Sequence, residues 1–327
     1  MRRLWAFVLG ITLSIGTLCS QQTSLSGPME GYVFDLPTQS FLPVIGLPGS
    51  ATFGPALISG FDNGWVAPHK NYGIAFQQGN CFLVTGLDSN PVSTGVAGVS
   101  GPPDAVVWSG DGSVAILYSR GGAWLQTVTG LPGAPQANAV VDLSSLGGSL
   151  SAVAADTTGQ NTAVAMQGAN GGVFLSSDGQ NFVSALPMAN PAALTFSGDG
   201  TSLYVLDGGA ITLTSFALRD SSSQTFALNG LPNPSAIATG RDAQGRPIVL
   251  VADSTDQIFQ AYDPATQQMV ANIPLYFPPT GIATLGQNSF VIYSRSQGGS
   301  PLWLFASVPQ PAVYFVPAAQ PNAGGSN

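Results

Sequence analysis

Short runs of alternating apolar and β-branched residues, bounded by Gly, Asp and Ser, recur along the chain. In one stretch they fall at residues 191–195, 202–206, 211–216 and 224–228. A period of two over so few residues, ended by turn formers, predicts short antiparallel β-strands. Four such strands in about 45 residues match the size of one blade of a β-propeller.

The same unit recurs six times. Each copy opens with a Pro- or Gly-rich link, a small residue and an apolar strand of small side chains. The small residues are Ala56, Ala105, Ala152, Ala193, Ala236 and Gly281, at a mean spacing of 45 residues. Such residues suit the first strand of a blade, because the blades converge at the ring axis. Larger aromatic residues fit further out, and the expected third strands contain Trp124, Phe174, Phe216 and Phe259.

We therefore predict an all-β fold, a β-propeller of about six four-stranded blades. Residues 31–35 and 41–46 add strand signals ahead of the first repeat. We expect these strands to pair with the C-terminal blade and close the ring without exposed edges, or to add a partial seventh blade. The expected organisation is a signal peptide (1–20), a linker (21–30), one propeller domain (31–318) and a flexible tail (319–327).

The content of charged residues argues against two classes of binding partner, nucleic acids and membrane surfaces. Charged residues form 7% of the chain, with Glu30 the one glutamate and Lys70 the one lysine. Long exposed helices, which carry Glu and Lys, are therefore not expected. The net charge is −8 and there is no Lys/Arg cluster. This argues against nucleic acid, whose binding depends on neutralising phosphates, and against electrostatic binding to a membrane surface.

The first twenty residues have the pattern of a signal peptide. Arg2 and Arg3 precede an apolar run over residues 4–18, which is short for a membrane span. We expect cleavage near residue 20, export to the periplasm or beyond, and no transmembrane span in the mature chain. Lipid attachment at Cys19 is an alternative that the bulky Leu18 disfavours. Cys81 would then be the one cysteine left, without an internal disulfide partner, and we expect a buried, inert thiol.

Candidate catalytic residues are few. His69 could act as a general base at a blade loop, but a polar turn after a strand explains it equally. Asp111, Asp178 and Asp199 lie in turns of the Ser-Gly-Asp-Gly kind, where hydrogen bonds within the turn account for an aspartate. The one close pair of aspartates is at positions 253 and 256, outside any calcium-loop motif. One His and two Cys do not supply a zinc site, so no catalytic residue, metal or cofactor is assigned.

Six short repeats with Gly-Asp-Gly turns resemble the secreted bacterial propellers of the NHL and YVTN/lactonase-like type over residues 31–317. The resemblance implies a possible hydrolytic site of acidic, His and Arg residues at a channel mouth. Besides its aspartates, this chain has Glu30 ahead of the ring, His69 in the first repeat, and few arginines after the signal segment: Arg120, Arg219, Arg241, Arg246 and Arg295. No motif in this chain assigns any of them a catalytic role. Residues 176–182 are also similar to the Asp-box turn of sialidase-like propellers, although a hairpin turn explains them better.

Three functions follow from these patterns. The preferred one is a non-catalytic binding or scaffold module outside the cytoplasm, monomeric, with an unknown protein or glycan ligand. A lactonase-like hydrolase is the second, and it predicts that His69 or several Asp and Arg residues converge at one channel mouth. An envelope- or carbohydrate-binding module is the third. It predicts exposed Trp and Tyr side chains on one face, and burial of Trp65, Trp108, Trp124 and Trp303 would weaken it.

Overall fold

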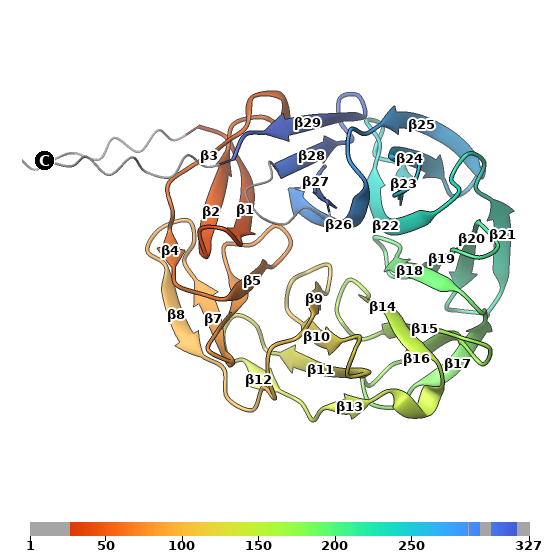
Figure 1. Cartoon of the computed structure of the whole chain (residues 1–327), viewed down its shortest axis with the longest axis horizontal. Helices are drawn as coiled ribbons and strands as arrows, with labels where there is room; N and C mark the ends of the chain where they lie inside the picture. The colour runs from red at the N-terminus through yellow and green to blue at the C-terminus, as the bar shows by residue number, and fades with distance from the viewer. Residues whose placement is uncertain (1–26, 287, 295–301, 319–327) are drawn as a thin grey trace, which may run out of the picture.

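The computed structural model describes residues 27–286, 288–294 and 302–318. They form seven β-sheets around a common axis, which are the blades of a β-propeller (Figure 1). The all-β prediction is confirmed, and the blade number is seven. The helical turns in the described residues are η1 (Pro48–Ser50) and η2 (Ser144–Leu146), and none is long or apolar enough to cross a membrane. The expected signal peptide, Cys19 and the expected tail lie outside the described residues.

The blades follow one another along the chain, and each is an antiparallel meander. Blade 1 contains β1 (Met29–Asp35), β2 (Ser40–Ile45), β3 (Thr52–Phe53) and β4 (Ile58–Ser59). Blade 2 contains β5 (Asn63–Val66), β6 (Gly73–Gln77), β7 (Asn80–Thr85) and β8 (Val92–Gly95). Blade 3 contains β9 (Ala105–Trp108), β10 (Ala115–Ser119), β11 (Trp124–Thr129) and a broken outer strand, β12 (Gln136–Ala137) and β13 (Val141–Asp142).

The remaining four blades are regular. Blade 4 contains β14 (Ser149–Ala155), β15 (Thr162–Gln167), β16 (Gly172–Ser176) and β17 (Val183–Pro187). Blade 5 contains β18 (Pro191–Phe196), β19 (Ser202–Asp207), β20 (Thr212–Ala217) and β21 (Ser223–Ala227). Blade 6 contains β22 (Pro234–Arg241), β23 (Pro247–Asp253), β24 (Ile258–Asp263) and β25 (Gln268–Pro274). Blade 7 contains β26 (Pro279–Gly286), β27 (Ser289–Ser294), β28 (Leu302–Ala306) and β29 (Ala312–Val316).

The first strand of each blade lies nearest the axis, as the small-residue pattern predicts for five of the six repeats. Ala105, Ala152, Ala193, Ala236 and Gly281 all lie in these inner strands. The prediction is wrong at Ala56, which lies between β3 and β4 in the outer layer of blade 1. The inner strand that follows is β5, whose small residue is Gly64. The four aromatic residues expected in third strands are found there, in β11, β16, β20 and β24.

Seven hydrophobic clusters hold the ring together, one at each interface between neighbouring blades. Alternate residues of a strand therefore face opposite neighbours: in β23, Leu250 packs toward blade 7 and Val251 toward blade 5. Burial of apolar side chains on both faces of every sheet is the main stabilising contribution. It also explains how a chain with so few charges folds without a disulfide among its described residues.

The ring closes by packing and not by a shared sheet. Of the two arrangements expected for the N-terminal strands, the seventh blade is the one found: they form blade 1 by themselves and do not pair with the C-terminal blade. Val44 of blade 1 packs against Leu285, Val291 and Leu304 of blade 7 in one cluster. A strand exchange is unnecessary because this interface is apolar like the other six. The first strand begins at Met29, inside the segment expected as a linker.

Blade 1 has the opposite polarity to the other blades. Strands β3 and β4 both pair with β2, so this blade has three layers. A blade of four layers brings the chain back to the face of the ring from which it started, whereas a blade of three layers leaves the chain on the opposite face. The inner strand β1 consequently begins beside the end of β26: a Cβ on Gly31 would lie 2.9 Å from Cδ1 of Leu285. It ends beside the start of β5, where Phe34 lies against Gly64. Between other neighbouring blades the inner strands run in the same direction, so their starts lie side by side. Near the starts of β14 and β18, for example, Ser151 Oγ donates to the Pro191 carbonyl at 2.6 Å.

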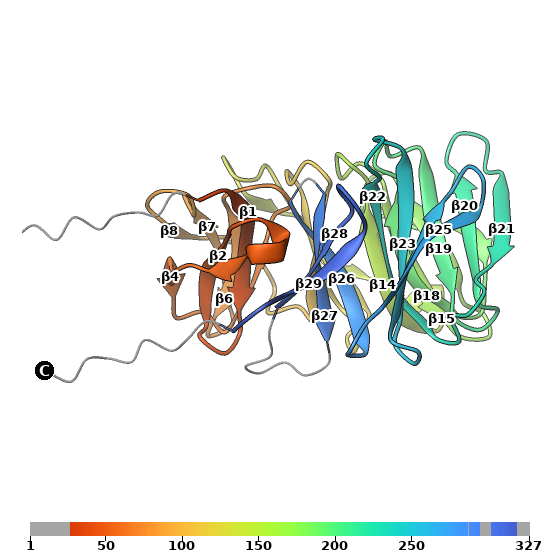
Figure 2. The same cartoon turned by 90° about the horizontal axis from the view of Figure 1, so that it is seen from above.

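The two faces of the ring therefore differ. We call the face with the turns between the first and second strands of blades 2–7 the turn face. Blade 1 contributes no such turn to it, because its own first turn, after Asp35, lies on the opposite face. Figure 2 shows the same ring from the side, with the strands running between the two faces.

Candidate functional site

The turn aspartates predicted to be structural are engaged within their own turns. Asp111 Oδ1 accepts from Ser109 Oγ at 2.7 Å and from the Ser113 amide at 2.9 Å. Asp199 Oδ1 likewise accepts from Ser197 Oγ at 2.6 Å and from the Thr201 amide at 3.1 Å. Hydrogen bonds to the ionised form keep the pKa of Asp199 below its ordinary value of 3.8. These carboxylates stabilise turns, and their low pKa is unsuited to proton transfer near neutral pH.

Two other acidic features also have structural explanations. Asp178, in the segment similar to an Asp-box, accepts from the Gln180 and Asn181 amides at 2.9 and 2.8 Å. Asp253 is fully buried and accepts from the amides of Thr255 and Asp256 at 2.9 and 2.8 Å, so the close aspartate pair is one turn. In the described part of the chain no three His, Cys, Asp or Glu residues lie together as metal ligands would.

A cavity of about 480 Å³ lies at the centre of the turn face, and we call it the axial pocket. Its lining comes from three turns that directly follow the inner strands of blades 2, 6 and 7, and from the turn between β28 and β29. The lining residues are His69, Arg241, Asp242, Ala243, Gly245, Asn288 and Val308. None of the described lining residues belongs to blade 1, which stands between blades 7 and 2. The pocket therefore opens where the reversed blade omits its turn.

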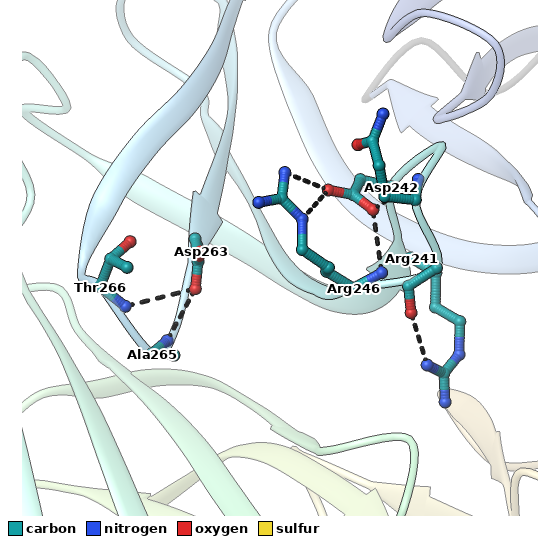
Figure 3. Close-up of polar contacts among 8 residues, drawn as sticks. Arg241, Asp242, Arg246, Asp263, Ala265 and Thr266 are labelled. Carbon is teal, nitrogen blue, oxygen red and sulfur yellow. Dashed lines mark hydrogen bonds and ion pairs between the residues drawn. The ribbon is translucent and has the colours of Figure 1, made fainter.

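Blade 6 supplies the charged groups of the pocket. Arg246 holds Asp242 from two atoms, with Nε and Nη2 each 2.7 Å from Oδ2, while the Gln244 and Arg246 amides bind Oδ1 at 2.9 Å (Figure 3). Partial desolvation acts to raise the pKa of Asp242, but these hydrogen bonds and the Arg246 charge together lower it. Asp242 is thus an ionised carboxylate with its acceptor positions filled.

Arg241 is the cation of this pocket without a carboxylate partner. Its side chain extends away from the Asp242–Arg246 pair (Figure 3), and Nη1 donates to the Gly245 carbonyl at 2.8 Å. The one ion pair among the described residues is the Arg246–Asp242 pair. Arg246 also faces Asp263, whose pKa it helps to lower after the hydrogen bond from the Ala265 amide. Arg241 is exposed and lines the pocket, and no carboxylate among the described residues forms an ion pair with it.

His69 enters the pocket from blade 2. It occupies a left-handed turn position, with φ of 57°, a conformation that histidine tolerates better than most residues. Burial lowers the pKa of His69 below its ordinary value of 6.5, and the charge of Lys70 lowers it further. The imidazole is consequently neutral at pH 7, with one ring nitrogen as donor and one as acceptor. No hydrogen bond to a carboxylate orients it among the described residues.

The structure separates most of the residues that the lactonase-like resemblance grouped. His69, Arg241 and the Arg246–Asp242 pair meet at the axial pocket. Arg120 lies elsewhere: Nε donates to the Ser151 carbonyl at 3.1 Å and the guanidinium covers Tyr118. Glu30 is in β1, Arg219 is exposed in the turn before β21, and Arg295 lies outside the described residues. Asn288 is a lining residue that sequence reasoning missed, since it follows β26 without a motif.

The tryptophans do not form an exposed platform. Trp65, Trp108 and Trp124 are half-buried in the cluster between blades 2 and 3, and Trp303 stacks on Phe277 with ring centroids 4.7 Å apart. The most exposed aromatic side chain is Tyr276, at 86%, on the link between blades 6 and 7. This link lies on the face opposite the axial pocket, so the pocket has no aromatic wall in its described lining.

The free cysteine is buried, as predicted. Cys81 is buried in β7, and burial raises the pKa of its thiol to about 12. A second cavity, of about 430 Å³, lies beside it against β8 and is lined mainly by glycine and apolar residues.

Comparisons with known proteins show the fold and nothing finer. No protein-family model and no curated protein matches the chain. The crystal structure of a functionally unknown protein from Desulfotomaculum acetoxidans DSM 771 is similar, with a TM-score of 0.54, 15% identity, and coverage of 75% of this chain and 78% of that one. A structure of a protein of unknown function from Bacteroides thetaiotaomicron VPI-5482 has a TM-score of 0.48 at 16% identity, covering 74% and 69%. Membership of the NHL or YVTN/lactonase-like families stays a prediction.

Proposed function

We propose that this chain is an exported propeller that binds a ligand without transforming it, and that the axial pocket is its binding site. The signal-peptide pattern of residues 1–20 supports export. The position of the pocket supports binding, because turns at the centre of a propeller face are the part of the ring that can vary without disturbing the blade cores.

One observation carries the non-catalytic assignment. The ionised carboxylate of the pocket, Asp242, already accepts from Arg246 and from two backbone amides, and no carboxylate of the described residues hydrogen-bonds to His69 to orient it or stabilise its protonated form. General acid–base and nucleophilic catalysis both need a donor–acceptor pair whose pKa values are matched to proton transfer. The described groups at this pocket are suited to hold a ligand through hydrogen bonds and charge.

A lactonase-like hydrolase is the second candidate, because His69 and Arg241 do line one pocket. In this alternative, Arg241 stabilises the developing oxyanion and the neutral imidazole of His69 acts as the base. The binding proposal expects no ring opening of γ- and δ-lactones by the purified mature chain above the rate in buffer, followed by proton release at constant pH. A rate above buffer that disappears in His69→Ala and persists in Arg219→Met would establish the hydrolase instead.

Export is tested separately by fractionating cells that express the full chain or the chain lacking residues 1–20, each with the same C-terminal reporter. The full chain is expected outside the cytoplasmic fraction and the shortened chain inside it. Retention of both chains in the cytoplasmic fraction would contradict export without bearing on the pocket.

A further inference from the structure

The axial pocket carries an unbalanced positive charge. Asp242 is paired with Arg246, and His69 is neutral at pH 7, so Arg241 sets the net charge of the described lining. The guanidinium presents five N–H donors, of which the structure uses one on the Gly245 carbonyl. Asn288 and His69, whose side chains each have an N–H donor, also line this pocket.

The guanidinium, amide and imidazole donors of this pocket favour a small anion as ligand. Planar guanidinium donors match the two oxygens of a carboxylate, and neutral amide and imidazole N–H groups complete the coordination of its lone pairs. A sugar would be expected to use an aromatic surface for its apolar face, whereas the described apolar lining consists of Ala243 and Val308. The pocket volume of about 480 Å³ is in the range of small-molecule sites.

We propose that the axial pocket binds a small organic carboxylate, with Arg241 as its charged anchor and Asn288 and His69 as hydrogen-bonding partners. This inference rests on the proposed function, since it names the ligand class of that same site. We expect a modest affinity, because the net charge of −8 of the full chain opposes the approach of an anion and Arg241 is the charge that attracts it locally.

The test uses the mature chain, with succinate as the probe and the uncharged, similarly shaped succinamide as its control, by isothermal titration at low salt. Succinate is expected to bind and succinamide to bind at least about tenfold more weakly. Arg241→Met should weaken succinate binding by about tenfold to a hundredfold. Arg241→Lys, which keeps the charge but loses the fork, should fall between Arg241→Met and the unchanged chain.

Arg219→Met is the matched control. It removes an exposed arginine from a turn on the same face but outside the pocket, and it should leave the succinate Kd unchanged within about twofold. Equal binding of succinate and succinamide, or equal losses in Arg241→Met and Arg219→Met, would overturn the proposal. So would inorganic phosphate displacing succinate with a lower Kd, since the site would then be a phosphate site.

Other outcomes separate this inference from the proposed function. If neither anion binds but a neutral glucoside binds and is lost in His69→Gln, the carboxylate assignment fails and the binding function stands. If succinate fails to bind and lactone opening appears that depends on His69, both fail. Far-UV circular dichroism and the urea midpoint of each variant establish that a lost affinity does not reflect unfolding.

Discussion

Blade 1 provides the most direct test of the seven-bladed ring, through the substitution Phe41→Ala. Phe41 is fully buried, at 0% exposure, in the cluster between blades 1 and 2. Its ring makes edge contacts with Phe34 and Phe61, at centroid distances of 5.2 and 6.0 Å. Truncating a buried Phe costs about 3–5 kcal/mol, and aromatic pairs add about 0.5–1.5 kcal/mol beyond buried area. The two contacts place the expected loss at about 4–5 kcal/mol, out of a total stability of about 5–15 kcal/mol.

The assay is urea unfolding followed by far-UV circular dichroism and by tryptophan fluorescence. The midpoint should fall while the slope stays constant, and both probes should move together, because Phe41 belongs to an interface of the ring. Tyr276→Ala is the control: it removes an aromatic ring that is 86% exposed and should change stability by no more than about 0.5 kcal/mol. A loss below about 1 kcal/mol for Phe41→Ala would refute the assignment of the N-terminal sheet as a core blade.

Further predictions concern the blade contacts, the turns and the thiol. Gly64→Ala should destabilise the chain by about 1–3 kcal/mol in the same assay, because its Cβ would lie 2.6 Å from Cδ2 of Phe34. Gly95→Ala is the control: its Cβ would meet nothing within 4 Å, so stability should not change. Asp199→Ala removes three acceptor contacts from one turn and should cost about 1 kcal/mol in urea unfolding, and an equal loss in Asp199→Asn would argue against a hydrogen-bonding role. The turn carboxylates have lowered pKa values, so their stabilisation is complete above their ordinary value of 3.8 and is lost as pH falls below it. Because the pKa of His69 is lowered below 6.5, this residue adds a separate loss of stability as pH falls below 6.5. In His69→Gln, which removes that contribution, the unfolding free energy should be level above about pH 5 and decline below about pH 4, and a step near pH 6.5 in this variant would contradict this. In a Cys19→Ser chain at pH 8, Cys81 should react with a thiol reagent only after denaturation. Burial raises the pKa of its thiol to about 12, and the residue is 5% exposed. Rapid labelling of the native chain would refute its burial.

The repeat was readable from the sequence because a local pattern determines each blade. A Pro- or Gly-rich link, a small residue and a strand recur at the inner position of five predicted blades, since crowding at the axis acts on each blade in the same way. The pattern misled at Ala56, where a Gly-Pro-Ala segment joins the halves of an outer strand and imitates an inner start. The true inner strand at Gly64 lacks the preceding proline. Its small residue is required by contact with Phe34 and Phe41, which no local pattern could show.

The axial pocket was not predictable for a different reason. His69, Arg241 and Asn288 are far apart in the chain and meet only because the ring places blades 6, 7 and 2 around a missing turn. That gap depends on the three-layer count of blade 1, which is a consequence of both β3 and β4 pairing with β2. The sequence shows strand signals there, but whether a broken strand forms one layer or two is decided by its partner. The structural roles of the turn aspartates, by contrast, follow from three or four adjacent residues and were predicted.

Reversal of one blade is also what makes a selective pocket possible in this fold. Seven blades of equal polarity would place seven similar turns around the axis. In this chain the aspartates of such turns accept hydrogen bonds from backbone amides of the same turn. Omitting one turn leaves room beside His69 and Asn288, and the blade 6 turn contributes Arg241 to the same lining. A pocket thus arises with little change to the blade cores. We therefore expect the function of this propeller beside its reversed blade, where the repeat fails, and not in the repeat itself.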